Sequence, residues 1–159
     1  MSSLLSKTYQ TITLSETNDI LTVTLNRPDK KNAMSLQMMA ELINVAKTLK
    51  KDRAIRAVII NGAGDTFCAG IDLADLNNPK NALMGLYELL KPTQSIFQKV
   101  CLIWREVPMP VIITTHGYCI GAGMQLALAC DFRITTPDCQ FAIMEAKWGL
   151  VPDMGLTQS

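Results

Sequence analysis

The chain has 159 residues, of which 48% are hydrophobic, and a formal net charge of +1. This length is enough for one domain with a substantial core, and we expect residues 1–159 to form a single domain. The balanced charge excludes the strongly basic surface by which proteins bind nucleic acid, and no apolar run is long enough to span a bilayer. We therefore expect neither a nucleic-acid partner nor a membrane partner.

The five cysteines form no C-x-x-C pair and their number is odd, which is typical of reduced, buried thiols. The N-terminal segment lacks the apolar stretch of a secretory signal. These features predict a cytoplasmic protein. Because the sequence ends soon after a glycine-marked turn at 149–155, we expect the domain to be incomplete after Ser159.

The first half of the chain alternates between strand and helix patterns. Alternating apolar and polar residues predict strands at 8–15 and 20–25, joined by a turn at 17–19. Ser35 is expected to cap a helix in which apolar residues recur at helical spacing as far as Leu49. Three methionines near its start are interpreted as core residues: Met34, Met38 and Met39.

The second half begins with a short run of branched apolar residues at 56–61, which predicts a parallel strand covered on both faces. Residues 65–92 are expected to be loop-like with a poor helix, because Pro79, Gly85 and Pro92 interrupt the pattern. A helix is predicted over 95–106. Further strands are predicted at 111–115, 131–135 and 140–143.

Three glycines, Gly117, Gly121 and Gly123, separate the strand at 111–115 from a helix expected over 124–129. Glycines at this point expose backbone amides, which with the positive end of the helix dipole favour a negatively polarised group. The same glycines are equally typical of a tight packing turn between strand and helix. The motif alone leaves both interpretations open.

A second glycine turn follows the strand at 56–61. Here Gly70 is expected to expose the amide of Ile71, as Gly121 and Gly123 frame the amide of Ala122. Two amides that converge on one oxygen stabilise an enolate-like charge, so the pair predicts an oxyanion hole. A dinucleotide-binding fingerprint is excluded, because it would require glycine at position 67 in one turn or at position 126 in the other, where the chain has Phe67 and Leu126.

Four blocks of sequence, in order, resemble the crotonase superfamily, the enoyl-CoA hydratases and isomerases. These blocks are L-N-R-P-D-K-K-N-A-M (25–34), F-C-A-G-I-D-L (67–73), G-Y-C-I-G-A-G-M-Q-L-A-L-A-C-D (117–131) and F-A-I-M-E-A-K-W-G-L-V-P-D-M-G (141–155). The resemblance implies an α/β fold built as a spiral of ββα turns. It also implies an acyl-CoA substrate whose thioester oxygen is held by the amides of Ile71 and Ala122.

The resemblance further implies which residues lie along the acyl-CoA groove. The adenine end is expected near Lys31, Asn32, Ala33 and Ala69. The remaining candidates for substrate or CoA contact are Gly70, Asp72, Leu73, Tyr118, Ile120, Gly121 and Met144. For several of these a structural role is the alternative: Lys31 as a solvated charge, Asp72 as a brace of its loop, and Met144 as core.

Hydratases of the superfamily carry two glutamates, and the chain has Gln125 at the first position and Glu145 at the second. Gln125 can orient a water or a substrate but cannot exchange a proton. Asp153 matches an acidic residue that dienoyl-CoA isomerases use, although a turn residue after Pro152 is the alternative. This pattern favours an isomerase with Glu145 as acid and base, Asp153 assisting and Gln125 orienting.

Other chemistry has little support in the sequence. His116 is the only histidine, so we expect it to be a packing or strand-end residue, with no metal and no cofactor apart from the coenzyme A of the substrate. The resemblance implies a homo-trimer or hexamer for a full-length protein, which is in doubt for this shorter chain. Two alternatives stay open: a hydratase that uses Glu145 alone, and a catalytically silent fragment that binds acyl-CoA or serves in assembly.

Overall fold

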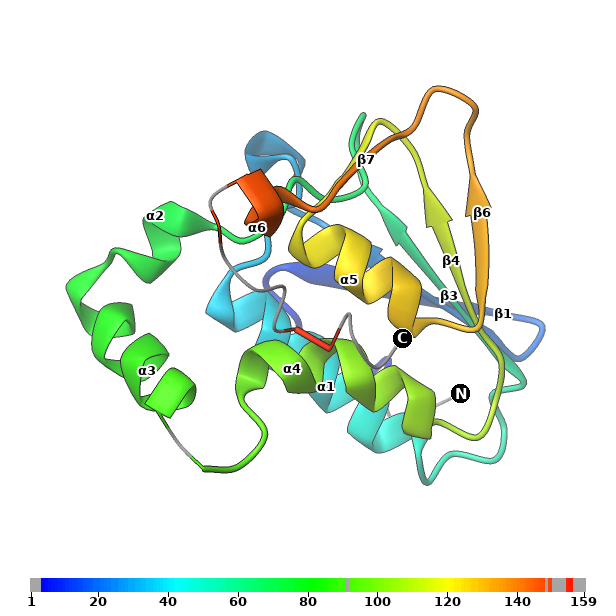
Figure 1. The fold of residues 1–159 in the computed structure, drawn as a ribbon. Helices are drawn as coiled ribbons and strands as arrows, with labels where there is room; N and C mark the ends of the chain where they lie inside the picture. Colours follow the sequence, from blue (N-terminus) through cyan, green and yellow to red (C-terminus); the bar gives the residue numbers. More distant parts are fainter. Residues whose placement is uncertain (1–3, 91, 148, 150–153, 156–159) are drawn as a thin grey trace.

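The larger of two β-sheets is the central element of the fold. The computed structural model describes residues 4–90, 92–147, 149, 154 and 155. Within them this sheet has five strands in the order β1 (Ile12–Thr17), β2 (Ile20–Leu25), β3 (Ala57–Gly62), β4 (Val111–Thr115) and β6 (Phe132–Thr135) (Figure 1). β1 runs antiparallel to β2, and every other neighbouring pair is parallel.

A second layer lies beyond the carboxyl ends of the parallel strands. It contains β5 (Tyr118–Ile120) paired in parallel with β7 (Gln140–Ala142). Two loop segments extend this layer by backbone hydrogen bonds: Cys68 N donates to Tyr118 O at 2.9 Å, and Ala69 N donates to Lys31 O at 3.0 Å. The chain therefore passes from the larger sheet to the second layer and then into a helix, repeatedly, which confirms the expected ββα spiral.

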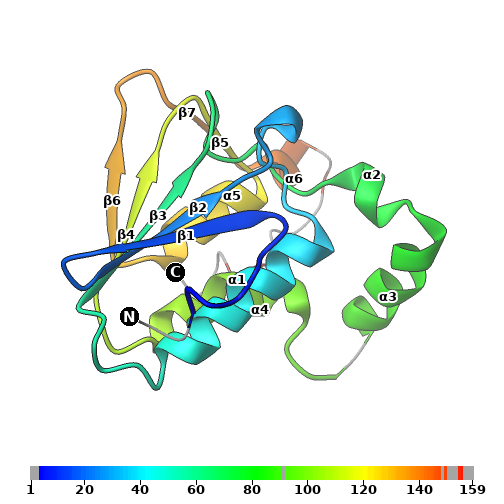
Figure 2. The ribbon, with the colours of Figure 1, turned by 180° about the vertical axis from the view of Figure 1, so that it is seen from behind.

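After each segment in the second layer the chain continues into a helix. They are α1 (Leu36–Leu49), α2 (Leu73–Leu76), α3 (Pro79–Leu90), α4 (Ile96–Leu102), α5 (Ala122–Ala129) and α6 (Met144–Lys147), with short 3₁₀ turns at Pro28–Lys30 and Ile103–Glu106. Helices α1, α4 and α5 lie together on one side of the larger sheet, as the views from front and back show (Figures 1 and 2). Helices α2 and α3 extend away from it, and α6 lies beside α5.

The core fills the space between the larger sheet and these three helices. Alternate residues of β2 to β4 are buried, among them Val23, Ile60 and Ile113, and they belong to the same buried cluster as the apolar stripe of α1. Ser35 caps α1 by accepting a hydrogen bond from Met38 N, as predicted. Met34, Met38 and Met39 are all fully buried, which confirms their assignment to the core.

Three predictions about individual elements were wrong. The first strand begins at Ile12 rather than at 8 and runs to Thr17, because Asn18 and Asp19 alone form the turn, both with positive φ. Strand β3 is buried on one face only, since Ala57 and Ile59 are half-exposed. The segment 65–92 is not loop-like: it contains α2 and the 12-residue helix α3, in which Pro79 stands at the start, where its missing N–H has no cost.

The short strand β5 was not predicted. It fills the space between Gly117 and Gly121, which the sequence pattern indicates only as a bend. In the described part of the chain, no helix has the length and apolar character required to cross a membrane. All five cysteines are free thiols, as expected, and four of them are buried.

Candidate active site

The two glycine turns of the sequence meet in the folded chain. Gly70 and Gly121 both have positive φ, at 104° and 53°, a region that side chains other than glycine rarely adopt. A Cβ at Gly121 would lie 3.7 Å from Gly70 Cα, and one at Gly70 would lie 3.5 Å from Ile120 O. The turns are therefore in van der Waals contact, although about fifty residues separate them.

Each turn leaves one amide without a hydrogen bond to another described backbone group. On one side Asp72 N donates to Met34 O, and on the other Gly121 N donates to Ala142 O. The amide of Ile71, which precedes Asp72, and the amide of Ala122, which follows Gly121, donate to no carbonyl of the described residues. The Ala122 amide is in addition the first of helix α5, where the helix dipole is positive.

A carboxylate stands beside the contact between the two turns. Glu145, on α6, has its Oε1 and Oε2 atoms 3.7 and 3.8 Å from the position of a Cβ at Gly121. Oε1 accepts a hydrogen bond of 2.7 Å from Gln125 Nε2. Oε2 is buried and has no hydrogen-bond partner among the described residues. A buried carboxylate oxygen without a partner is costly, and such groups occur at sites that act on a ligand.

Gln125 is held at both ends of its side-chain amide. It is 1% exposed, and besides its bond to Glu145 its Oε1 accepts a hydrogen bond of 3.0 Å from Met154 N. The sequence predicts that Gln125 orients a water or a substrate. In the structure the two bonds to Glu145 and Met154 hold it against the protein itself.

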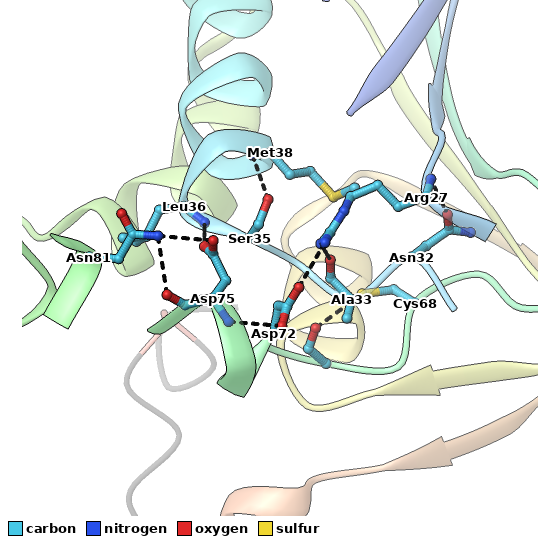
Figure 3. Close-up of polar contacts among 11 residues, drawn as sticks. Arg27, Asn32, Ala33, Ser35, Leu36, Met38, Cys68, Asp72, Asp75 and Asn81 are labelled. Atoms are coloured by element: carbon cyan, nitrogen blue, oxygen red, sulfur yellow. Dashed lines mark hydrogen bonds and ion pairs between the residues drawn. The ribbon is translucent and has the colours of Figure 1, made fainter. Parts of the chain in front are cut away.

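A polar network braces the turn that carries Ile71 (Figure 3). Asp72 caps α2 by accepting from Asp75 N at 3.1 Å, and its Oδ2 lies 2.8 Å from Arg27 Nη2. Partial burial raises the pKa of Asp72, but the hydrogen bonds from Arg27 and from the Asp75 and Ala74 amides, with the Arg27 charge, bring it below its ordinary value. Asp72 is therefore an ionised group that braces its loop, and its contact with substrate or CoA stays a prediction.

The network continues into the start of α1 and of α3. Asp75 accepts a hydrogen bond from Leu36 N at 2.9 Å, and Asn81 Nδ2 donates to Asp75 at 2.9 Å (Figure 3). Arg27 Nη1 also donates to Ala33 O at 2.6 Å. The loop before α1 and the turn after β3 are thus tied to each other through charged side chains.

The predicted adenine end gathers four candidate residues. Lys31 Nζ lies 5.4 Å from the centre of the Tyr118 ring, a cation–π contact, and Ala69 is hydrogen-bonded to the Lys31 carbonyl. The Asn32 side chain is fully buried and bonded to the carbonyls of Ala63 and Thr66. The Asn32 side chain is therefore not available to a ligand, while Lys31 and Tyr118 reach the surface.

The remaining predicted residues have more varied positions. Leu73 is 69% exposed at the start of α2, and Met144, half-buried, begins α6 next to Glu145. Asp153 lies outside the described residues, so its assisting role stays a prediction. His116 bonds to Gly64 O at 3.0 Å at the end of β4, in agreement with a strand-end residue.

Two residues that contribute to the site were not predicted from the sequence. Arg27 belongs to the block at 25–34 that carries the resemblance, but nothing in that block pairs it with Asp72. Met154 contributes only its backbone N–H, which no side-chain pattern signals. In the described part of the chain, no three His, Cys, Asp or Glu side chains form a group able to hold a metal ion. That the protein needs no metal or cofactor stays a prediction.

The ββα spiral, which carries two open amides beside a carboxylate, is a fold of the crotonase type. The sequence profile of the enoyl-CoA hydratase/isomerase family matches residues 15–159. The chain therefore belongs to the enoyl-CoA hydratase/isomerase family, within the crotonase superfamily.

Several known proteins are similar to the chain. The mitochondrial Delta(3,5)-Delta(2,4)-dienoyl-CoA isomerase of Rattus norvegicus is 39% identical over 144 residues, which cover 87% of this chain and 44% of that protein. The (E)-benzylidenesuccinyl-CoA hydratase of Thauera aromatica is 31% identical over 149 residues, covering 93% and 56%. The chain thus spans about half the length of the curated relatives it matches.

A solved structure shows the same fold with a ligand. A crystal structure from Thermobifida fusca YX, of a protein named as an enoyl-CoA hydratase and in complex with CoA, has a TM-score of 0.78 and 33% identity. The match covers 99% of this chain and 61% of that one. The common fold is therefore one on which a relative holds CoA.

Proposed function

We propose that the protein isomerises a double bond in an enoyl- or dienoyl-CoA thioester. The Ile71 and Ala122 amides bind the thioester oxygen, and Glu145 removes a proton from one carbon and returns it to another. The observation that carries this proposal is the position of the Glu145 carboxylate, against the contact between the two glycine turns that carry the open amides.

The reaction needs one base and one oxyanion site. As Glu145 removes the proton, the electron pair of the C–H bond moves through the conjugated system to the thioester oxygen. The two amides stabilise the enolate that forms, which is typically worth about 2.7–4 kcal/mol for each donor. When the enolate collapses, the same carboxyl group protonates the carbon at the far end of the conjugated system, so the protein ends as it began.

The neutral Gln125 supports isomerisation over hydration. Hydration requires a water to be held, deprotonated and added, a task that two carboxylates share in hydratases of the superfamily. Here the group opposite Glu145 is an amide whose two ends are already bonded to protein. The 39% identity to a dienoyl-CoA isomerase supports the same choice.

The experiment compares products on matched thioesters. The complete protein is incubated with a 3,5-dienoyl-CoA, a 3-enoyl-CoA and a 2-enoyl-CoA, and the products are separated and identified by mass and by absorbance of the conjugated diene. We expect double-bond migration without a gain in mass. Glu145→Gln should lower that rate by about 10²–10⁴-fold while CoA thioester binding persists. Clean water addition to the 2-enoyl-CoA, with no migration, would exclude the isomerase.

Hydration on Glu145 alone is the second candidate. It is favoured by the similarity to a protein named as a benzylidenesuccinyl-CoA hydratase, at 31% identity over 93% of this chain. The same assay separates the two, because a hydrated product is heavier by one water. A complete protein that binds the thioesters but changes none of them would favour a third role, a silent acyl-CoA-binding or assembly protein.

A further inference from the structure

The orientation of the Gln125 amide follows from its partners. A backbone N–H can only donate, so the Gln125 atom that faces Met154 N at 3.0 Å must be the oxygen. The Gln125 nitrogen then faces Glu145 Oε1 at 2.7 Å, and it can only donate to that oxygen. The Met154 amide therefore determines which end of Gln125 meets the carboxylate.

This orientation makes the two oxygens of Glu145 unequal. Oε1 receives a hydrogen from Gln125, so a proton bound at Oε1 would collide with that N–H. Oε2 is buried and has no hydrogen-bond partner among the described residues. Any proton that the carboxyl group holds is thus directed to Oε2, close to Gly121 and the open Ala122 amide.

We propose that Gln125 is a positioning residue that reserves Glu145 Oε2 for proton transfer. It does so by occupying Oε1 and by fixing the carboxylate plane from the buried start of α5. This inference rests on the proposed function, since it assigns the reacting oxygen of the same base. It differs from substrate orientation, because in it Gln125 acts through Glu145 alone.

The charges around Glu145 are few. Of the elements packed against it, α5 presents Gln125 and the two turns present Gly70 and Gly121, none of which titrates. Among the described residues no cation forms an ion pair with Glu145, whereas Arg27 pairs with Asp72. Asp153, next to Met154 in sequence, is a titratable group outside the described residues, so every variant below is also made in an Asp153→Asn background.

Two variants of the complete protein test the proposal. Gln125→Met keeps the length of the side chain and removes both hydrogen bonds, and Gln125→Glu keeps the shape but places a second carboxyl group beside Oε1. The matched control is Gln37→Met, because Gln37 makes the equivalent bond to another carboxylate, from Nε2 to Glu41 Oε1 at 2.9 Å on α1. Folding of each variant is checked by thermal unfolding.

The main measurement is independent of activity. The carboxyl carbon of Glu145 is followed by ¹³C NMR at neutral pH, with the resonance assigned by its absence in Glu145→Gln. The chemical shift of a carboxylate carbon depends on the hydrogen bonds that its oxygens accept, so Gln125→Met should move the Glu145 resonance. Gln37→Met should leave that resonance in place.

Kinetics supply the second readout. Gln125→Met should lower kcat by about 10–100-fold with KM changed by less than about threefold. In Gln125→Glu the two carboxyl groups share one proton, so activity should persist while that proton is held and fall as it leaves. The pH–rate profile of this variant should therefore have an alkaline limb that the unaltered protein lacks.

An unchanged Glu145 carboxyl resonance in Gln125→Met, or a rise in KM with kcat unaltered, would overturn the proposal, because both would mean that Gln125 does not act on Glu145. If Gln125→Met does not fold, the profile of Gln125→Glu decides, and the absence of a new limb counts against the proposal. A complete protein inactive on all three thioesters, with the Glu145 resonance shifted as expected, would refute the proposed function and leave the positioning role supported.

Discussion

A β-carbon on Gly121 would stand 3.7 Å from Oε1 of Glu145 and 3.8 Å from Oε2. The turn before α5 and the short helix α6 thus meet without a side chain between them. Because Gly121 has φ 53° and ψ −116°, the glycine is required for its backbone conformation as well as for its lack of a side chain. The Glu145 carboxylate therefore lies against Gly121, the residue that precedes the open amide of Ala122.

The Ala122 amide can be tested without altering any side chain. Replacing alanine 122 by lactic acid converts the N–H into an ester oxygen and leaves the methyl group in place. If this amide stabilises the enolate, kcat should fall by about 10²–10³-fold, or about 2.7–4 kcal/mol. The same exchange at Gly123, the next residue of α5, is the control, and an equal loss at both positions would point to a disturbed helix start.

Close packing at Gly123 predicts a large effect from a single methyl group. A Cβ there would lie 2.6 Å from Cys68 Cβ and 3.0 Å from Cys68 O, so Gly123→Ala should lower the free energy of unfolding by about 1–3 kcal/mol. Gly85→Ala, in helix α3, is the control: among the described residues its Cβ would contact only Leu76 Cδ2 of α2, at 3.7 Å. That variant should gain about 0.4–1 kcal/mol, as measured by urea unfolding of the complete protein.

Glu41 predicts how stability depends on pH. Burial raises its pKa, but hydrogen bonds from the Thr11 hydroxyl, the Gln10 amide, the Gln37 side chain and the Thr11 amide lower it more, so the folded pKa lies below the ordinary 4.5. A lowered folded pKa gives stability that is present above 4.5 and is lost as the pH falls through the folded value. Glu41→Gln should cost about 1.5–3 kcal/mol at pH 7, and the cost should shrink below pH 4.5.

The measurement for Glu41 is urea unfolding of both proteins at neutral and acidic pH. Glu106→Gln is the control, because Glu106 pairs with Lys50 on the surface, where both side chains are 41–51% exposed. Exposed pairs contribute about 0–1 kcal/mol. A difference between Glu41→Gln and the unaltered protein that is as large at pH 3 as at pH 7 would contradict this account.

The cysteines should differ in reactivity. Burial raises the pKa of Cys68 to about 11 and that of Cys130 to about 12, and it raises the pKa values of Cys101 and Cys119 as well. Since the thiolate is the reactive form, these four should resist alkylation in the native protein. Cys139, which is half-buried, should react first. Peptide mass spectrometry after timed iodoacetamide treatment, with and without urea, checks the order.

The sequence predicts best those elements whose signals are local. Helix α1 has an apolar stripe and the Ser35 cap, and both are found where expected. Strand β4 has five β-branched residues, and its bounds are as predicted. In both cases the residues that make the pattern are the residues that form the core, so the pattern and the structure have one cause.

The errors arise where tertiary contacts or the position within an element, rather than the local sequence, determine the structure. Pro79 signals a break in sequence, yet at the first position of α3 it is compatible with a helix. The three residues of β5 are too few for a period, and their partner β7 lies about twenty residues further along the chain. The bond between Met154 N and Gln125 joins a backbone group to a side chain 29 positions away, and no residue type signals it. The position of Glu145 was predictable only through the resemblance.

Asn32 extends the consequences of the fold to ligand affinity. Its buried side chain donates to Ala63 O and Thr66 O and accepts from Arg27 N. One side-chain amide therefore links the loop before α1 to the turn after β3. The loop that carries Lys31 is therefore held in place by hydrogen bonds before any ligand binds. If a thioester binds there as proposed, ordering the protein should cost it little free energy, so less of its affinity is lost to conformational entropy.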